Sequence, residues 1–167
     1  DVGNMAHLRK AFPAAVPIKN LGELSNHGIS LAIVASPPCF HAEQTMTLLK
    51  AGMAVLCEKP MATTTAESEA MIEAATTENR LLAIGLFRRF FPATQTIRQI
   101  LAQDLLGDIQ SVYCSEGGHF RWPVQSTSFF HKKSAGGGVL MDIGVHLLDT
   151  LIWWWGYPIK VFYQDDA

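Results

Sequence analysis

Charged residues are scarce in this 167-residue sequence: they make up 17% of it, with 13 Lys and Arg against 15 Asp and Glu. A net charge of −2 is not typical of proteins that bind phosphate backbones, so we predict no nucleic-acid partner. The longest apolar stretch, residues 139–155, is interrupted by Asp142, His146 and Asp149. It falls short of the about 20 apolar residues that a membrane span needs, so we predict no membrane helix.

Cysteine is also rare, with three residues at positions 39, 57 and 114 and no CxxC spacing. An odd number without that spacing argues against a disulfide framework or a zinc site and favours a reducing compartment. We therefore expect a cytoplasmic protein. Because the sequence begins at Asp1 rather than at an initiator Met, its start gives no information on a signal peptide.

Short apolar runs alternate with helical patterns in the first half of the chain. Strands are predicted at 29–35, 53–57 and 81–87, the first of them buried on both faces, and helices at 41–50 and 65–79. This order is typical of right-handed βαβ units in a parallel sheet, which bind ligands at the carboxyl ends of the strands. Those ends carry Ser36-Pro37-Pro38, Glu58-Lys59-Pro60 and Phe87-Arg88-Arg89. We therefore predict one ligand-binding edge formed by these three segments.

The pattern changes near residue 89. A helix is predicted at 92–103, a strand from 107 to 116, an irregular region at 117–134, a helix at about 139–155 and a further strand from residue 161. We therefore divide the chain into two partial domains, 1–88 and 89–167.

Lys59 lies where a buried strand ends and a ligand is expected. A lysine that loses hydration there can donate a proton to a substrate hydroxyl or bind it. The alternative interpretation is a surface turn lysine paired with Glu58.

Asp142, His146 and Asp149 are spaced i, i+4 and i+7, so they share one face of the predicted helix. A carboxylate one turn from an imidazole can orient it and raise its basicity, as a general base requires. One alternative is an ordinary solvated face, although such a face normally also carries Lys, Glu, Gln or Arg. A divalent metal site is another alternative, which we disfavour because too few nitrogen or sulfur ligands accompany His146.

Glycines 136–138 precede this helix, and three tryptophans, 153–155, end it. The glycines either form an anion-binding nest or let the helix approach the site closely, and we favour close approach. The tryptophans are interpreted as core or interface residues.

Four segments together resemble the Gfo/Idh/MocA family of nicotinamide-dependent oxidoreductases: ASPPCFH at 35–41, CEKPM at 57–61, GLFRRFFP at 85–92 and GGGVLMDIGVHLLD at 136–149. The resemblance implies a partial Rossmann-type parallel sheet, followed by part of an α/β domain with a mainly antiparallel open sheet. The family's glycine-rich phosphate loop has no counterpart in this sequence. We therefore expect the middle of a chain roughly twice as long, itself inactive and with little affinity for dinucleotides.

The resemblance also implies residue roles. His146 would be the general acid/base, with Lys59 and Asp142 beside it as catalytic residues. The implied contacts of NAD or NADP are Asp1, Ser36, Pro37, Pro38, His41, Glu58, Lys59 and Pro60, and those of the substrate are Lys59, Arg89, Asp142, His146 and Asp149. No metal is implied.

We accordingly expect hydride transfer between a sugar, cyclitol or related polyol and NAD(P), by a protein that is a homo-oligomer at full length. Two alternatives remain open at this point: a non-catalytic ligand-sensing or regulatory relative of the same fold, and the family's NAD-dependent glycosidase branch.

Overall fold

The first half of the chain forms a parallel three-stranded sheet, as predicted. The computed structural model describes residues 8–18, 20–119, 121 and 130–164. After a 3-10 helix, η1 (Leu21–His27), come the strands β1 (Leu31–Val34), β2 (Ala54–Cys57) and β3 (Leu82–Ile84), in the order β1-β2-β3. Leu31 pairs with Ala54 and Val34 with Cys57, both in parallel register.

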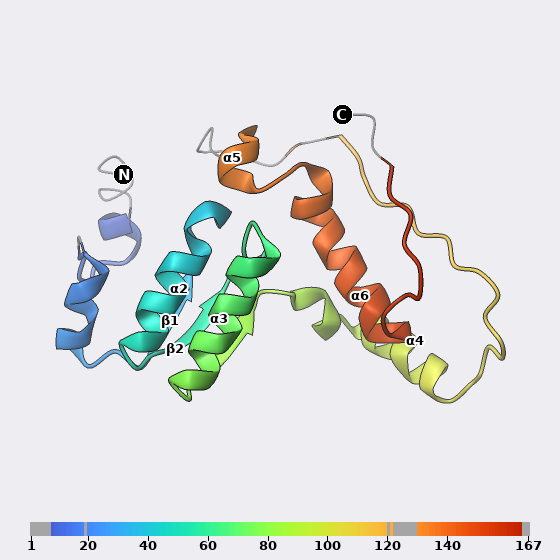
Figure 1. The fold of residues 1–167 in the computed structure, drawn as a ribbon, viewed down its shortest axis with the longest axis horizontal. Coiled ribbons are helices and arrows are strands. Elements are labelled where there is room, and N and C mark those ends of the chain that lie inside the picture. The colour runs from blue at the N-terminus through green and yellow to red at the C-terminus, as the bar shows by residue number, and fades with distance from the viewer. Residues whose placement is uncertain (1–7, 19, 120, 122–129, 165–167) are drawn as a thin grey trace.

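The helices α2 (His41–Lys50) and α3 (Thr65–Thr77) connect these strands and lie side by side over one face of the sheet (Figure 1). The apolar core lies between this helix pair and the sheet. Its buried members are Val34, Ala42, Leu48, Leu49, Met53, Val55, Cys57, Ala62 and Met71. Burying these side chains is the main source of stability for this half of the chain.

The prediction that the strand at 29–35 is buried on both faces is wrong for the described residues. Val34 faces the core, whereas Leu31 and Ile33 are exposed. Successive side chains of a strand point to opposite faces, and within the described part of the chain the helices cover only one of them. An apolar sheet face is therefore left in contact with solvent.

The start of α3 is fixed by a capping box between Thr64 and Glu67. The Thr64 hydroxyl accepts a hydrogen bond from the Glu67 amide (3.2 Å), and the Glu67 carboxylate accepts one from the Thr64 amide (3.1 Å). Further hydrogen bonds from Thr63 lower the pKa of Glu67. These contacts also order the chain between β2 and α3, which carries Lys59.

The second half is helical where it is regular. A short 3-10 helix, η3 (Phe87–Phe90), leads into α4 (Pro92–Ala102), and the short helix α5 (Lys132–Ala135) precedes a π-helical turn, η5 (Leu140–Gly144), and α6 (Val145–Trp155). The predicted helices at 92–103 and 139–155 are confirmed, and α5 lies in a region predicted to be irregular. Figure 1 shows α4 beside the carboxyl end of α6.

The strands predicted in 107–116 and from residue 161 do not form. Both segments are irregular, and Tyr113 and Phe162 are 92% and 86% exposed. A strand exists only when its backbone pairs with another strand, and in the described ranges neither segment has such a partner. The antiparallel sheet expected for residues 89–167 is therefore not present in the part that the structure describes.

By length and composition, the helical segment Lys132–Trp155 could cross a membrane. Core helices of soluble proteins pass the same test, so this is weak evidence. The absence of a membrane partner stays a prediction.

Gly136 brings the start of this helical segment against the loop after β2. It ends α5 with a φ of 81°, and a Cβ placed on it would lie 3.0 Å from Cγ2 of Thr63. A positive φ and so close a neighbour both favour glycine. The interpretation that the glycines permit close approach is thus confirmed at Gly136.

We expect Gly136→Ala to lower the free energy of unfolding by about 1–2 kcal/mol, because alanine in the left-handed region is strained and its Cβ crowds Thr63. Urea titration followed by circular dichroism measures this difference. Gly138→Ala is the matched control, since a Cβ at Gly138 would meet nothing within 4 Å. Equal stability of the two variants would show that the Gly136 contact contributes nothing.

Candidate active site

The carboxyl ends of the strands are held together by backbone hydrogen bonds. The amide of Glu58 donates to the carbonyl of Val34 (2.9 Å), and the amide of Gly85 donates to the carbonyl of Cys57 (2.8 Å). Beyond β1, the Ser36 hydroxyl donates to the side-chain oxygen of Gln44 (2.8 Å). The segments that follow β1, β2 and β3 therefore meet at one edge, as the sequence predicted.

Lys59 reaches from this edge to the helical segment of the second half. Its Nζ donates to Oδ1 of Asp142 at 2.6 Å and to the backbone carbonyl of Asp142 at 2.8 Å. Both side chains are partly buried, at 22% and 34% exposure. Glu58 instead accepts a hydrogen bond from the Lys59 amide (3.3 Å). The alternative in which the Lys59 amine pairs with Glu58 is therefore wrong.

Asp142 lies in the π-helical turn η5, directly before α6. Such wide turns occur frequently at functional sites. No sequence pattern predicts this turn, because its residues fit an uninterrupted helical pattern. The turn places both a carboxylate and a carbonyl oxygen of one residue against the Lys59 amine.

His146 is buried in the first turn of α6, with 4% of its surface exposed. Its ring packs edge-on against Phe87, with 4.8 Å between the ring centroids. Its Nδ1 has no hydrogen-bond partner among the residues that the structure describes. Burial lowers the pKa of His146, and the positive charges of Lys59 and Arg88 lower it further. Glu116 and Asp142 act in the opposite direction with smaller effect.

Asp142 raises the pKa of His146, as the helix spacing predicted, but the net pKa of His146 is lowered. Asp142 is engaged by Lys59, and desolvation outweighs its charge. A lowered pKa means that His146 is neutral at pH 7, which is the form that accepts a proton.

We expect His146 to titrate below pH 6.5, because its charged form is disfavoured by burial. Arg88→Leu removes a positive charge and should raise the midpoint, whereas Glu116→Gln removes a negative charge and should lower it. Proton NMR of the His146 Cε1–H against pH measures all three midpoints. Shifts of the same sign in the two variants would contradict this electrostatic account.

Arg89 and Asp149 bind each other. The Arg89 Nε donates to Oδ2 of Asp149 at 2.8 Å, and its Nη2 donates to the other carboxylate oxygen. The Asp149 side chain is only 10% exposed. This pair ties η3 to α6 and so fixes Phe87 against His146. Their predicted contact with substrate stays a prediction.

Arg88 and Glu116 form a second bidentate pair, which the sequence did not predict. The two nitrogen–oxygen distances are 2.7 and 2.5 Å, and the pairing lowers the pKa of Glu116. Arg88 stood in a predicted strand-end segment, but Glu116 is 28 residues away in a segment predicted to be a strand. No spacing rule connects two such positions.

The predicted cofactor residues that the structure describes lie at the same edge, but His41 is more deeply buried than the others. Ser36, Pro37, Glu58 and Pro60 belong to the loops at the strand ends, and Pro38 begins the 3-10 helix η2 (Pro38–Phe40). His41 lies beneath them, because its ring is buried and both ring nitrogens face carbonyl oxygens of these loops. Asp1 lies outside the described residues. Contact of any of them with a cofactor stays a prediction.

Within the described ranges, no three His, Cys, Asp or Glu side chains are grouped so that they could hold a metal ion.

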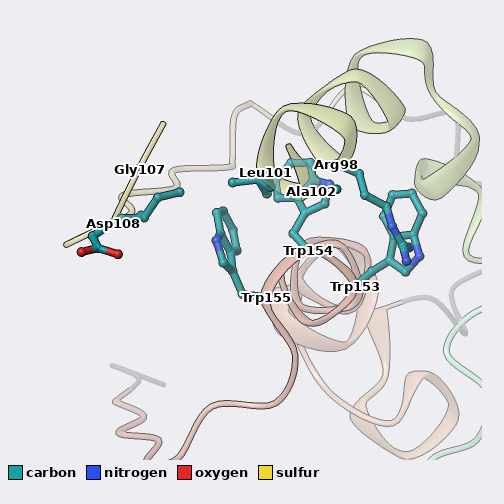
Figure 2. A pocket seen from close by; sticks show the side chains of 9 residues that line it. Arg98, Leu101, Ala102, Gly107, Asp108, Trp153, Trp154 and Trp155 are labelled. Carbon is teal, nitrogen blue, oxygen red and sulfur yellow. The ribbon is translucent and has the colours of Figure 1, made fainter. Parts of the chain in front are cut away.

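A cavity of about 540 Å³ lies away from Lys59 and His146, between α4, residues 107–109 and the end of α6 (Figure 2). Arg98 stacks on the ring of Trp153, with 4.0 Å from Cζ to the ring centroid, and the Trp154 indole donates to the carbonyl of Thr94 (3.1 Å). Trp155 projects toward Gly107 and Asp108 (Figure 2). Trp153 and Trp154 thus pack α6 against α4, in line with their interpretation as core or interface residues, whereas Trp155 is 43% exposed.

Comparison with known proteins agrees with this arrangement. Residues 3–86 match the family described as an oxidoreductase family with an NAD-binding Rossmann fold, and residues 94–165 match the GFO/IDH/MocA C-terminal domain. The chain is 36% identical over 131 residues to D-glucoside 3-dehydrogenase of Escherichia coli, covering 75% of this chain and 35% of that protein. It is 32% identical over 155 residues to scyllo-inositol 2-dehydrogenase (NADP(+)) of Bacillus subtilis, covering 92% of this chain and 43% of that protein.

Solved structures show the same fold. Aldose-aldose oxidoreductase from Caulobacter crescentus superposes with a TM-score of 0.68 at 28% identity, over 81% of this chain and 40% of that one. For myo-inositol 2-dehydrogenase from Lactobacillus plantarum the TM-score is 0.73 at 19% identity, over 92% of this chain and 46% of that one. The chain thus spans less than half the length of these relatives. Through its two family matches, it belongs to the Gfo/Idh/MocA family of oxidoreductases.

Proposed function

We propose that this protein is an NAD(P)-dependent dehydrogenase of sugars, cyclitols or related polyols. The observation that carries the proposal is the Lys59–Asp142 pair together with the buried His146 of the adjoining helix, at the edge where the strands end. The relatives named as glucoside and inositol dehydrogenases support this substrate class.

The residues at this edge fit the nicotinamide end of a dinucleotide. The segments with Ser36, Pro37, Pro38, Glu58 and Pro60 would hold the cofactor. The buried Nδ1 of His146, which has no partner within the described ranges, is the kind of polar atom that a bound molecule satisfies. When bound, the nicotinamide supplies or accepts the hydride. The sequence contains no GxGxxG, so the fit concerns this end of the cofactor alone.

Two side chains of this protein act on the substrate hydroxyl during oxidation. The neutral imidazole of His146 accepts the proton of the substrate hydroxyl. The Lys59 ammonium donates a hydrogen bond to the oxygen on which negative charge develops. Asp142 holds the Lys59 amine through two oxygens, which fixes its direction before the substrate arrives.

Formation of NADH or NADPH by the complete gene product, measured against a panel of inositols, aldoses and glucosides, tests this proposal. We expect at least one polyol to reduce the cofactor stoichiometrically. Release of free sugar without net reduction would instead indicate the glycosidase chemistry. Cofactor binding without turnover across the panel would indicate a sensing role.

We propose further that the protein acts in the cytoplasm as a homo-oligomer, with a small molecule rather than a nucleic acid or a membrane as its partner. The lack of CxxC spacing supports a reducing compartment, and the near-neutral charge supports a small-molecule partner rather than a nucleic acid. The homo-oligomer is what the family resemblance implies. Sedimentation of the complete gene product tests the oligomeric state.

A further inference from the structure

His41 is a deeply buried histidine, 1% exposed, to which the proposed chemistry gives no role. It begins α2, and its two ring nitrogens each lie 2.8 Å from a backbone carbonyl oxygen: Nδ1 from that of Pro60 and Nε2 from that of Ser36. A neutral imidazole can donate to one of these oxygens, and a doubly protonated one to both. The ring therefore bridges two loops that are far apart in the sequence.

These two loops leave the carboxyl ends of neighbouring strands. Ser36 follows β1, and Pro60 follows β2 and Lys59. The backbone bond from Glu58 to Val34 is the last one that continues the ladder between β1 and β2. Beyond it, the His41 ring lies between the two loops, with a ring nitrogen at hydrogen-bond distance from the carbonyl oxygen of each.

Lys59 needs its backbone fixed as well as its amine. Its side chain has four rotatable bonds, so a displaced backbone carries the amine to a different place or requires a less favourable rotamer. Asp142 holds the amine, and the loop holds the other end of the side chain. Catalysis is sensitive to such placement, since a 1 Å displacement can cost about 100-fold in rate.

We propose that His41 is a positioning residue for Lys59. By bridging the carbonyls of Ser36 and Pro60, it holds the loop that presents the Lys59 amine to Asp142 and to the substrate oxygen. The inference rests on the proposed dehydrogenase function. It assigns His41 a role through Lys59 rather than through contact with the cofactor.

A double-mutant cycle in the complete gene product tests this role. The four proteins are wild type, His41→Phe, Lys59→Met and the double variant, and kcat and KM are measured per folded molecule with the polyol that wild type oxidises. We expect His41→Phe to lower kcat by about 10- to 100-fold with a smaller change in KM for the cofactor. In the Lys59→Met background the same substitution should lower kcat by less than about twofold, because there is no amine left to position.

Leu49→Ala is the matched control. Leu49 is fully buried in the same helix, about 12 Å from His41 along its axis, so it perturbs the core away from the two loops. We expect it to reduce the folded fraction without changing kcat per folded molecule. If His41→Phe does not fold, His41→Gln, which retains an N–H donor, replaces it in the cycle.

Equal losses of kcat in the two backgrounds would overturn the inference, as would a His41→Phe variant with wild-type kcat. A larger rise in KM for the cofactor than loss of kcat would also overturn it and point to direct cofactor binding by His41. Absence of turnover in wild type is a different result, because it removes the proposed function before any variant is compared.

Discussion

Replacing His146 with asparagine is expected to lower turnover of the polyol by about 10²- to 10⁴-fold, the usual contribution of a positioned general base. Asparagine keeps a polar side chain in the buried position but cannot accept the hydroxyl proton. Steady-state kinetics of the complete gene product measure the loss. The wild-type kcat/KM for oxidation should rise with pH through a midpoint below 6.5, the pKa of His146 having been lowered by burial, and the variant should lack that step.

His27→Asn is the control for this substitution, because His27 is exposed at the end of η1. It should retain wild-type turnover and the same pH profile. A His146→Asn enzyme within about threefold of wild type would exclude His146 as the base, since such a change is well below the usual effect.

Replacing Lys59 with methionine is expected to lower kcat by about 10²- to 10³-fold, as removal of a donor to a developing oxyanion does. Methionine has a similar length and no charge, so packing is preserved while the hydrogen bonds to Asp142 are lost. Lys59→Arg should not restore activity, because a planar guanidinium cannot replace a compact ammonium between two oxygens of Asp142.

Lys50→Met provides the matched control at an exposed lysine in the last turn of α2. Its kinetics should equal those of wild type. If Lys59→Met kept a normal kcat and raised only the KM of the substrate, Lys59 would contribute uniform binding rather than stabilisation of the developing charge.

The sequence predicted those parts of the fold that depend on local patterns. The strands β1 to β3, their connecting helices and α4 follow from apolar runs and helical spacing, and the site edge follows from the topology of a parallel sheet. The approach of Lys59 to Asp142, 83 residues away, came from the resemblance to a family rather than from spacing.

The features that sequence patterns missed depend on packing. The pKa of His146 is lowered by burial and by the positive charges of Lys59 and Arg88, which the i, i+4 spacing to Asp142 does not reveal. The π-helical turn at Asp142 and the Arg88–Glu116 pair have no local signature. The segments 107–116 and from residue 161 are not strands in the described structure. Their apolar pattern predicts a strand only where a partner strand exists to pair with the backbone.

Transfer of deuterium from substrate to cofactor distinguishes direct hydride transfer from other reactions. The polyol that the complete gene product oxidises is labelled with deuterium at the carbon bearing the reacting hydroxyl, and the reduced cofactor is analysed by NMR. Direct hydride transfer places deuterium at C4 of the nicotinamide, in an amount equal to the polyol oxidised. Deuterium released to water, or a consumed polyol without reduced cofactor, would contradict it.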